Sequence, residues 1–232
     1  MDSADGLRSA IEGGADRIEL CSALELGGLT PSLGLIELAS KAPIPVYAMI
    51  RPRGGNFCFS AEDEAIMLAD IRNARNAGLA GIVVGASLSD GSLDAVMLER
   101  LIAEAKGLGV TLHRAFDLVP DMEIALQQAI ALGFERILTS GLSQTAEDGL
   151  DKLRRLAEMA GEGISIMPGS GVNAENVGRI MEATGAAEVH ASCRVPVEEK
   201  DPRAIAFGFA AEQSFRTCVQ RVRALKTAIA RA

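Results

Sequence analysis

The chain has 232 residues, of which 48% are hydrophobic and 3% aromatic, and its formal net charge is −8 at pH 7. This length is ordinary for one α/β barrel, whose interior small and β-branched residues fill well. The acidic balance, without a block of Lys or Arg, excludes a typical nucleic-acid binder. No apolar run reaches the roughly 18 residues of a membrane helix, and the N-terminus has no signal-peptide pattern.

Apolar, β-rich runs alternate with helix-like segments along most of the chain. The predicted helices are 5–13, 32–40, 62–77, 93–108, 122–132, 146–159 and 174–184. The predicted strands are 17–21, 45–51, 81–85, 110–114, 136–140, 164–168 and 188–192. Ser60 and Asp121 are predicted N-caps, and Gly133 and Gly185 are typical of helix C-termini. This alternation predicts right-handed βαβ units and a parallel sheet.

The strand count predicts a TIM-type (β/α) barrel with seven visible strands. A closed barrel of this type has eight. The chain opens with a helix, so we expect the first strand to be missing at the N-terminus. An open doubly wound sheet is the alternative, less favoured because no Gly-x-Gly-x-x-Gly turn follows the first predicted strand. We expect one domain over residues 1–232, with a helical C-terminal tail over 201–232.

Chemically capable side chains concentrate where the predicted strands end. Active sites of such barrels lie at the C-terminal ends of the strands, and alternation along a strand decides which side chains face inward. The side chains expected at this rim are Glu19, Cys21, Arg51, Arg53, His113, Arg114, Asp117 and His190. Glu19 could instead form a packing ion pair with Arg51, and the arginines could be ordinary rim charges.

Two loops rich in small residues lie at the same expected rim. Gly169, Ser170 and Gly171 follow one predicted strand and precede a helix, and Ser140 ends the strand before it. Glycines at a helix N-terminus let backbone N–H groups approach a phosphate. Glycine also serves ordinary turns, so the position of the loop is what favours an anion site.

Several motifs together resemble the CutC family, historically called copper homeostasis proteins. They are Gly14–Cys21, Gly27–Ser32, Ile50–Gly55, Thr111–Asp117, Leu138–Gly141, Gly169–Val172 and Glu188–His190, within a match from about Gly13 to Ser192. The resemblance implies a TIM-type barrel, a cytoplasmic location, a homo-oligomer (dimer or tetramer) and a role in copper homeostasis. Family members usually begin with a strand that this sequence lacks, which agrees with the strand count.

The first functional hypothesis is copper binding. Thiolates suit Cu(I), and Cys21 would pair with Cys58 because the strand and loop that hold them are expected to be neighbours; the two histidines are alternative ligands. The sequence has no Cys-x-x-Cys and no Met-rich run, and nearby arginines oppose a cation. All four cysteines are otherwise expected to be free thiols in a reducing cytosol.

The second hypothesis is an enzyme or binder for a small anionic metabolite. Arg51, Arg53 and Arg114 would hold a carboxylate or phosphate, together with Ser140 and the 169–172 loop. Glu19 and His113 would be the acid/base pair, with Asp117 or His190 orienting them. A lyase, isomerase or hydrolase could use these groups, and a non-catalytic scaffold is a third possibility.

Overall fold

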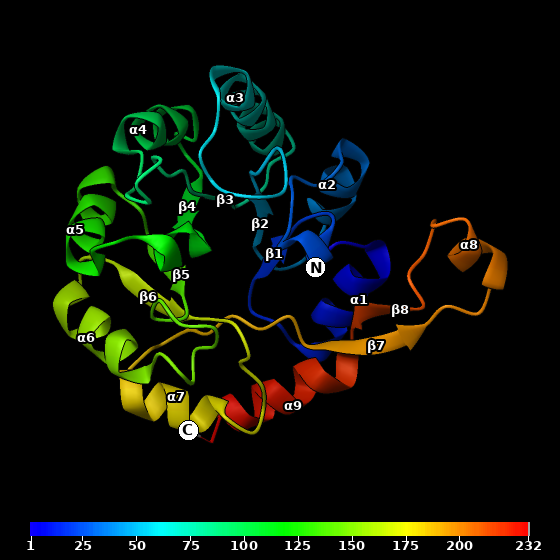
Figure 1. Cartoon of the computed structure of the whole chain (residues 1–232). Coiled ribbons are helices and arrows are strands. Elements are labelled where there is room, and N and C mark those ends of the chain that lie inside the picture. Colours follow the sequence, from blue (N-terminus) through cyan, green and yellow to red (C-terminus); the bar gives the residue numbers. More distant parts are fainter. Residues whose placement is uncertain (232) are drawn as a thin grey trace.

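The computed structural model describes residues 1–231, in which a curved parallel sheet is wrapped by helices (Figure 1). The sheet has six strands in the order β1-β2-β3-β4-β5-β6. They are β1 (Ile18–Leu20), β2 (Val46–Met49), β3 (Gly81–Val84), β4 (Gly109–Leu112), β5 (Arg136–Thr139) and β6 (Ser165–Pro168). The helices around it are α1 (Ala4–Gly13), α2 (Leu33–Ala39), α3 (Ala61–Asn76), α4 (Ala95–Glu104), α5 (Met122–Leu132), α6 (Leu150–Ala160) and α7 (Val177–Thr184).

Local sequence explains where the helices begin and end. Ser60 caps α3 in a capping box with Asp63, and the Asp121 carboxylate accepts from the first backbone N–H groups of α5, so both predicted N-caps are confirmed. Gly133 and Gly185 follow α5 and α7 in the left-handed conformation, with φ of 83° and 67°. Each side-chain cap of this kind stabilises a helix by about 1 kcal/mol.

Near the N-terminal ends of the strands, a tyrosine ring fills the space over two glycines. Tyr47 pairs in register with Gly81, which pairs with Gly109. A Cβ on Gly81 would lie 2.2 Å from the Tyr47 ring, and one on Gly109 would lie 2.3 Å from its hydroxyl. The Tyr47 hydroxyl donates to Glu135, and the Arg136 guanidinium lies over the ring. These side chains fill the N-terminal end of the sheet, so the open space lies toward the C-terminal ends of the strands.

The predicted seventh strand is wrong. Segment 188–192 runs beside β6, and its His190 N–H donates to the Pro168 carbonyl at 2.9 Å, but the segment forms no ladder. An extended pattern becomes a strand only when a neighbour satisfies its backbone, and the sheet is open on this side. The observed architecture is a six-stranded parallel half-barrel, and the predicted seven strands of a nearly complete barrel are not found among residues 1–231.

Side chains, rather than a backbone ladder, connect the two sides of this opening. Arg17, just before β1, lies 2.8 Å from Glu188, and Glu188 also contacts Arg136 at 3.0 Å. At the β1 edge, the Met1 ammonium donates to the Glu19 carbonyl, and the Met1 carbonyl accepts from the Cys21 N–H. These two bonds are those of a parallel bridge opposite Leu20.

The C-terminal residues form an arm and a closing helix. The arm is an antiparallel pair, β7 (Arg194–Glu198) and β8 (Gln213–Thr217), joined through α8 (Pro202–Ala206), and it projects from the body in Figure 1. Helix α9 (Val219–Ile229) then packs against α1 and α7. The tail predicted as helical therefore also contains a strand. None of the helices described, of which α3 is the longest, has the length and apolar character of a membrane span.

Candidate functional site

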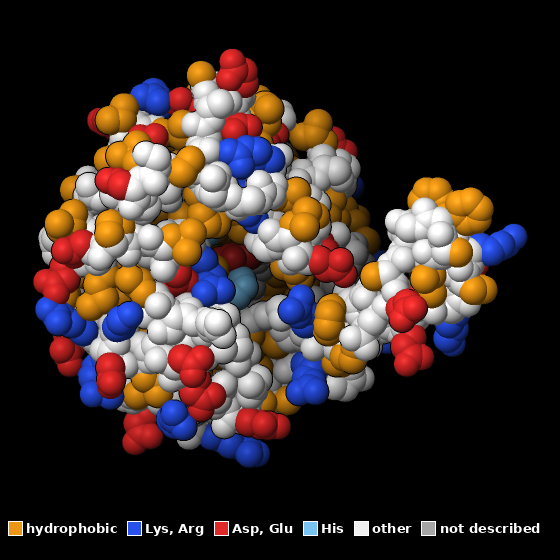
Figure 2. All heavy atoms as spheres, viewed as in Figure 1, with side chains coloured by type: hydrophobic (Ala, Val, Ile, Leu, Met, Phe, Trp, Pro, Cys, Tyr) orange, Lys and Arg blue, Asp and Glu red, His pale blue; other side chains and the backbone are white. Residues whose placement is uncertain are grey.

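A cavity of about 500 Å³ opens at the C-terminal ends of the strands. Figure 2 shows it as the hollow in the centre of the face, with a histidine inside and basic side chains around it. The predicted site residues that line it are Glu19, Cys21, Arg51, His113, Arg114, Ser170, Gly171 and His190. The predicted residues that do not line it are Arg53, Cys58, Asp117, Ser140 and Gly169.

Arg51 is a buried cation without a carboxylate partner among residues 1–231. It is 5% exposed and follows β2. Its two terminal nitrogens donate to the backbone carbonyls of Leu26, Gly28 and Gly55. Its Nε has no partner, and the guanidinium lies 4.8 Å from the centre of the Phe57 ring. Burial and the nearby Arg53 lower the pKa of Arg51. The alternative ion pair with Glu19 is not formed.

His113 is a neutral imidazole with a fixed tautomer. The ring is 3% exposed, and Nδ1 accepts from the Ala115 N–H at 3.1 Å. The ring proton therefore sits on Nε2, which has no partner. Burial, and then the charge of Arg51, lower the pKa of His113 from 6.5 to about 3. Gly85 makes room for the ring, because a Cβ there would lie 2.5 Å from His113 Cε1.

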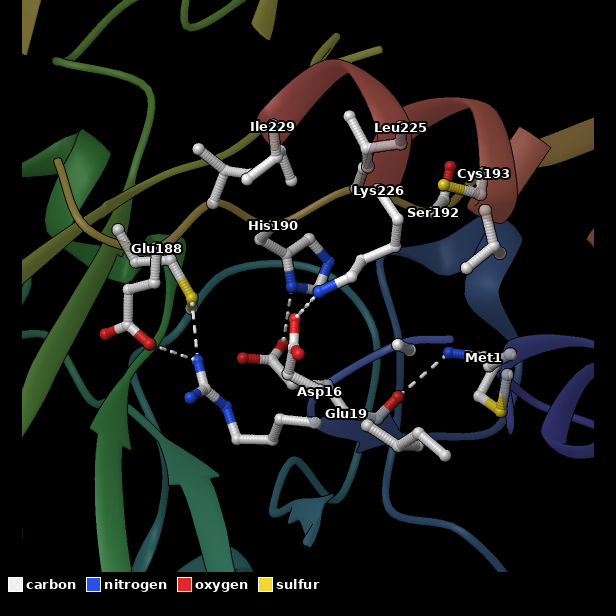
Figure 3. Close-up of a pocket in the computed structure, with 18 of the residues that line it drawn as sticks. Met1, Asp16, Glu19, Glu188, His190, Ser192, Cys193, Leu225, Lys226 and Ile229 are labelled. Atoms are coloured by element: carbon white, nitrogen blue, oxygen red, sulfur yellow. Dashed lines mark hydrogen bonds and ion pairs between the residues drawn. The ribbon is translucent and has the colours of Figure 1, made fainter. Parts of the chain in front are cut away.

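Glu19 presents one carboxylate oxygen to a histidine and leaves the other without a partner. His190 Nδ1 lies 3.3 Å from Glu19 Oε2 (Figure 3). Oε1 is buried and has no hydrogen-bond partner, and the side chain is 10% exposed. A second cavity, of about 320 Å³, lies beneath α9, and Glu19 and His190 line both cavities. Figure 3 shows the residues around this second cavity.

Asp117 organises the rim and does not touch His113 by any hydrogen bond. Its carboxylate accepts from Thr139 Oγ1 at 2.5 Å and from the Ser140 N–H at 3.0 Å, and it pairs with Arg114 Nε at 2.6 Å. Arg114 also donates to Ser140 Oγ at 2.7 Å. These contacts hold the loops after β4 and β5 together. The Asp117 carboxylate therefore partly neutralises the positive charge that Arg114 presents to the cavity.

The predicted pair of Cys21 and Cys58 is not brought together in this cavity. The buried Cys21 thiol donates to the Met1 carbonyl, and burial is the main cause that raises its pKa. The Cys58 thiol donates to the Leu88 carbonyl on a different loop. Arg53, which lies in the same loop as Cys58, pairs with Asp63 at 3.0 Å. Across residues 1–231, no group of three or more His, Cys, Asp or Glu side chains is placed to hold a metal ion.

The glycine-rich loop is tightly folded. Ser170 and Gly171 have φ of 74° and 76°, and Ser170 Oγ donates to the Gln144 carbonyl. A Cβ on Gly169 would lie 2.4 Å from Leu138, so this glycine serves packing. Helix α7 begins at Val177, after a further turn rather than directly after the loop. The phosphate role of the loop stays a prediction.

Sequence reasoning missed two arginines at the cavity. Arg194 begins β7 and Arg221 lies in α9, and both line the cavity. Arg194 lies over the Phe215 ring, and neither arginine has an ion-pair partner in the described part of the chain. Arg221 lies in the part of the chain that was predicted to be a helical tail, but its contact with the cavity depends on how α9 packs, and the arm that holds Arg194 was not predicted.

The comparisons with known proteins agree with the motifs. Residues 1–195 match the model of the CutC family. A CutC family protein of Rhizobium meliloti is 52% identical over 97% of this chain and 92% of its own length. One of Caulobacter vibrioides is 54% identical over 88% and 83%. The crystal structure of the putative copper homeostasis protein CutC from Streptococcus agalactiae has a TM-score of 0.73 and 38% identity, covering 75% of this chain and 87% of that one.

More distant structures share only the fold. The thiamine phosphate pyrophosphorylase of Pyrococcus furiosus has a TM-score of 0.59 and 14% identity, over 98% of this chain and 89% of its own. A similarity at this identity shows a related arrangement of strands and helices and carries no activity with it.

Proposed function

The chain belongs to the CutC family, and from this premise we propose that its cavity binds a small anionic metabolite with a carboxylate or phosphate group. Arg51 is the observation that supports this most strongly. A buried guanidinium bonded only to neutral carbonyls keeps its full positive charge. An anion 4 Å away gains about 4 kcal/mol at an effective dielectric constant near 20.

The other cavity residues fit the same ligand. Arg114 adds a second guanidinium at the rim, and the loop of Ser170 and Gly171 lines the same cavity beside it. Glu19, with His190 orienting it, is the proposed acid/base group. The role of His113 is that of a hydrogen-bond donor, because a pKa of about 3 keeps the ring neutral at pH 7.

The test compares two arginines, one inside the cavity and one outside. Thermal shift and calorimetry against phosphate, glycerol 3-phosphate, pyruvate and citrate should give saturable stabilisation by at least one of them. Arg51→Met should weaken that binding by roughly 10- to 1,000-fold, since a lost charged contact is worth about 1.5–4 kcal/mol. Arg53→Met is the matched control and should bind as the wild type does. Equal binding by both variants, or no binding by the wild type, would refute the proposal.

Copper homeostasis, the role in the name of the Streptococcus relative, supplies a second candidate function. Met1, Cys21, Met49 and Cys193 all line the cavity, and thiol and thioether sulfurs suit Cu(I). The residues fit a dedicated site poorly, because Arg51 opposes a cation and the Cys21 thiol must lose a proton whose pKa is raised.

A Cu(I) titration against a chromophoric competing chelator tests this second candidate. If the cavity holds Cu(I), Cys21→Ser should lower the affinity at least tenfold, whereas Cys58→Ser, whose sulfur lies outside the cavity, should leave it unchanged. The same affinity in the wild type and in Cys21→Ser would remove the candidate.

The family also suggests a cytoplasmic location and a homo-oligomer, dimer or tetramer, and we include both in the proposal. Phe207 and Phe209 support association, since they stack on each other at the tip of the arm and are 74% and 86% exposed. Light scattering of the purified chain measures its mass in solution. A monomeric mass at micromolar concentration would refute the oligomer.

A further inference from the structure

We infer that the cavity catalyses proton transfer at a carbon next to a carbonyl group, with Glu19 as the base and His113 as the neutral donor to the carbonyl oxygen. The inference rests on the proposed function, because it requires a small anion in the cavity. It goes further by naming the reaction and the substrate class, which is a carbonyl compound with a carboxylate or phosphate group.

The observation behind it is a set of buried polar atoms without partners. Within residues 1–231 these atoms are Glu19 Oε1, Arg51 Nε, His113 Nε2 and Ser87 Oγ. The residues of the first three line the same cavity. An unsatisfied buried polar group costs about 1–3 kcal/mol, and nearly all such groups in folded proteins have partners. Three of these atoms belong to side chains that line one cavity, although each atom is itself buried. Small rotations of these side chains would bring the atoms to a molecule bound there, which would then supply the missing partners.

The strand register places the two donors beside each other. Met49 pairs with Val83, and Val84 pairs with Leu112. Continued past the strand ends, the same register aligns Arg51 with Gly85 and Gly85 with His113. Gly85 has no side chain to separate the two groups. Both also contact one ring, since Phe57 lies 4.8 Å from the Arg51 guanidinium and 4.7 Å from the His113 imidazole.

The three atoms differ in what they offer a ligand. Arg51 Nε–H and His113 Nε2–H are donors, and both can point to an oxygen that gains negative charge. Glu19 Oε1 is an acceptor that can take a proton, while His190 Nδ1 lies 3.3 Å from the other oxygen of that carboxylate. Two donors for an oxygen and one free carboxylate oxygen for a proton match a carbonyl group and its neighbouring C–H.

The step conserves atoms and electrons. Glu19 Oε1 takes the proton from the carbon, and the electron pair of that C–H bond forms a carbon–carbon double bond. The pair of the carbonyl double bond moves onto its oxygen, where His113 and Arg51 donate hydrogen bonds to the new oxyanion. The proton then returns from Glu19, or a deuteron returns if the carboxyl group has exchanged with heavy water. No oxidant or reductant is needed.

Hydrogen–deuterium exchange observed by proton NMR tests the inference. Pyruvate and dihydroxyacetone phosphate are the probes, incubated with the full chain in heavy water. The wild type should speed loss of the signal of the hydrogens next to the carbonyl above a buffer blank. Glu19→Gln should slow it at least 100-fold, in line with the usual contribution of a general base. His113→Leu, which has no donor in place of Nε2–H, should slow it about 100- to 1,000-fold through loss of one oxyanion donor.

Controls separate this inference from the proposed function. Glu37→Gln alters an exposed acid of α2 that lines neither cavity and should exchange the probes as the wild type does. Glu19→Gln should still bind the probe by calorimetry, whereas Arg51→Met should lose both binding and exchange. Binding of both probes by the wild type without faster exchange, or equal exchange by Glu19→Gln, would overturn the inference alone. Absence of binding of any anion would overturn the proposed function as well.

Discussion

Acid should destabilise the fold through one buried imidazole. The pKa of His113 is 6.5 in an unfolded chain and about 3 in the folded one. Between these values the unfolded state binds a proton that the folded state does not, so the free energy of unfolding falls as the pH falls through this window. Each pH unit is worth about 1.4 kcal/mol. From pH 6.5 to pH 4 the expected loss is about 3 kcal/mol, a large share of a typical 5–15 kcal/mol.

Urea unfolding at pH 7, 6, 5 and 4 measures this loss. In His113→Gln the other groups titrate as before, so its free energy of unfolding should fall less steeply by about 1.4 kcal/mol per pH unit. NMR of the unmodified chain checks the cause directly, since His113 and His190 are the two histidines of the sequence. His190→Gln assigns the resonances. The His113 ring should stay neutral, with its proton on Nε2, at pH 5. Equal pH slopes in the two proteins, or titration of His113 near pH 6.5, would refute the reasoning.

Three further substitutions test the packing and the rim. Leu98→Ala removes a fully buried side chain of α4 and should cost about 2–5 kcal/mol in urea unfolding. Gly85→Ala brings a Cβ within 2.5 Å of the His113 ring, so anion-induced thermal stabilisation should fall strongly; an unchanged response would contradict the placement of that ring. Asp117→Asn removes the negative charge that pairs with Arg114 on a carboxylate that also accepts hydrogen bonds from Thr139, Ser140 and Leu142. It should lower the free energy of unfolding by about 2 kcal/mol, measured by calorimetric unfolding. An unchanged free energy of unfolding would contradict this role of the carboxylate.

The positions of side chains near the strand ends could be predicted because two local rules determine which way they face. Side chains alternate along a strand, and parallel strands finish on the same side of the sheet. These rules were enough to place Glu19, Arg51 and His113 at one cavity. They do not say how a loop folds. They therefore predict that Asp117 orients a histidine, whereas its carboxylate binds loop backbone, and that Arg53 holds a ligand, whereas it pairs with Asp63 outside the cavity.

The sequence pattern could not predict which segments pair through their backbones when they lie far apart in the chain. Segment 188–192 alternates as a strand does and lies beside the edge strand β6, yet it makes one backbone bond there, from the His190 N–H to Pro168, and not the ladder of a strand. The antiparallel pair β7 and β8 is mostly exposed and joins residues up to 23 positions apart, from Arg194 to Thr217. Its strand Arg194–Glu198 alternates over only five residues and contains a proline, and Arg194 was not predicted as a cavity residue.

Because the sheet is open on one side, the cavity has one wall held by backbone hydrogen bonds and one wall held by side-chain contacts. Across β3, β4 and β5 every widening breaks backbone hydrogen bonds of a continuous ladder. Between β1 and segment 188–192 the contacts are those of side chains, Arg17 with Glu188 and Glu19 with His190, and no backbone ladder resists a widening there. Adjustment to ligands of different bulk should therefore occur along this one seam, while the wall that holds His113 stays in place.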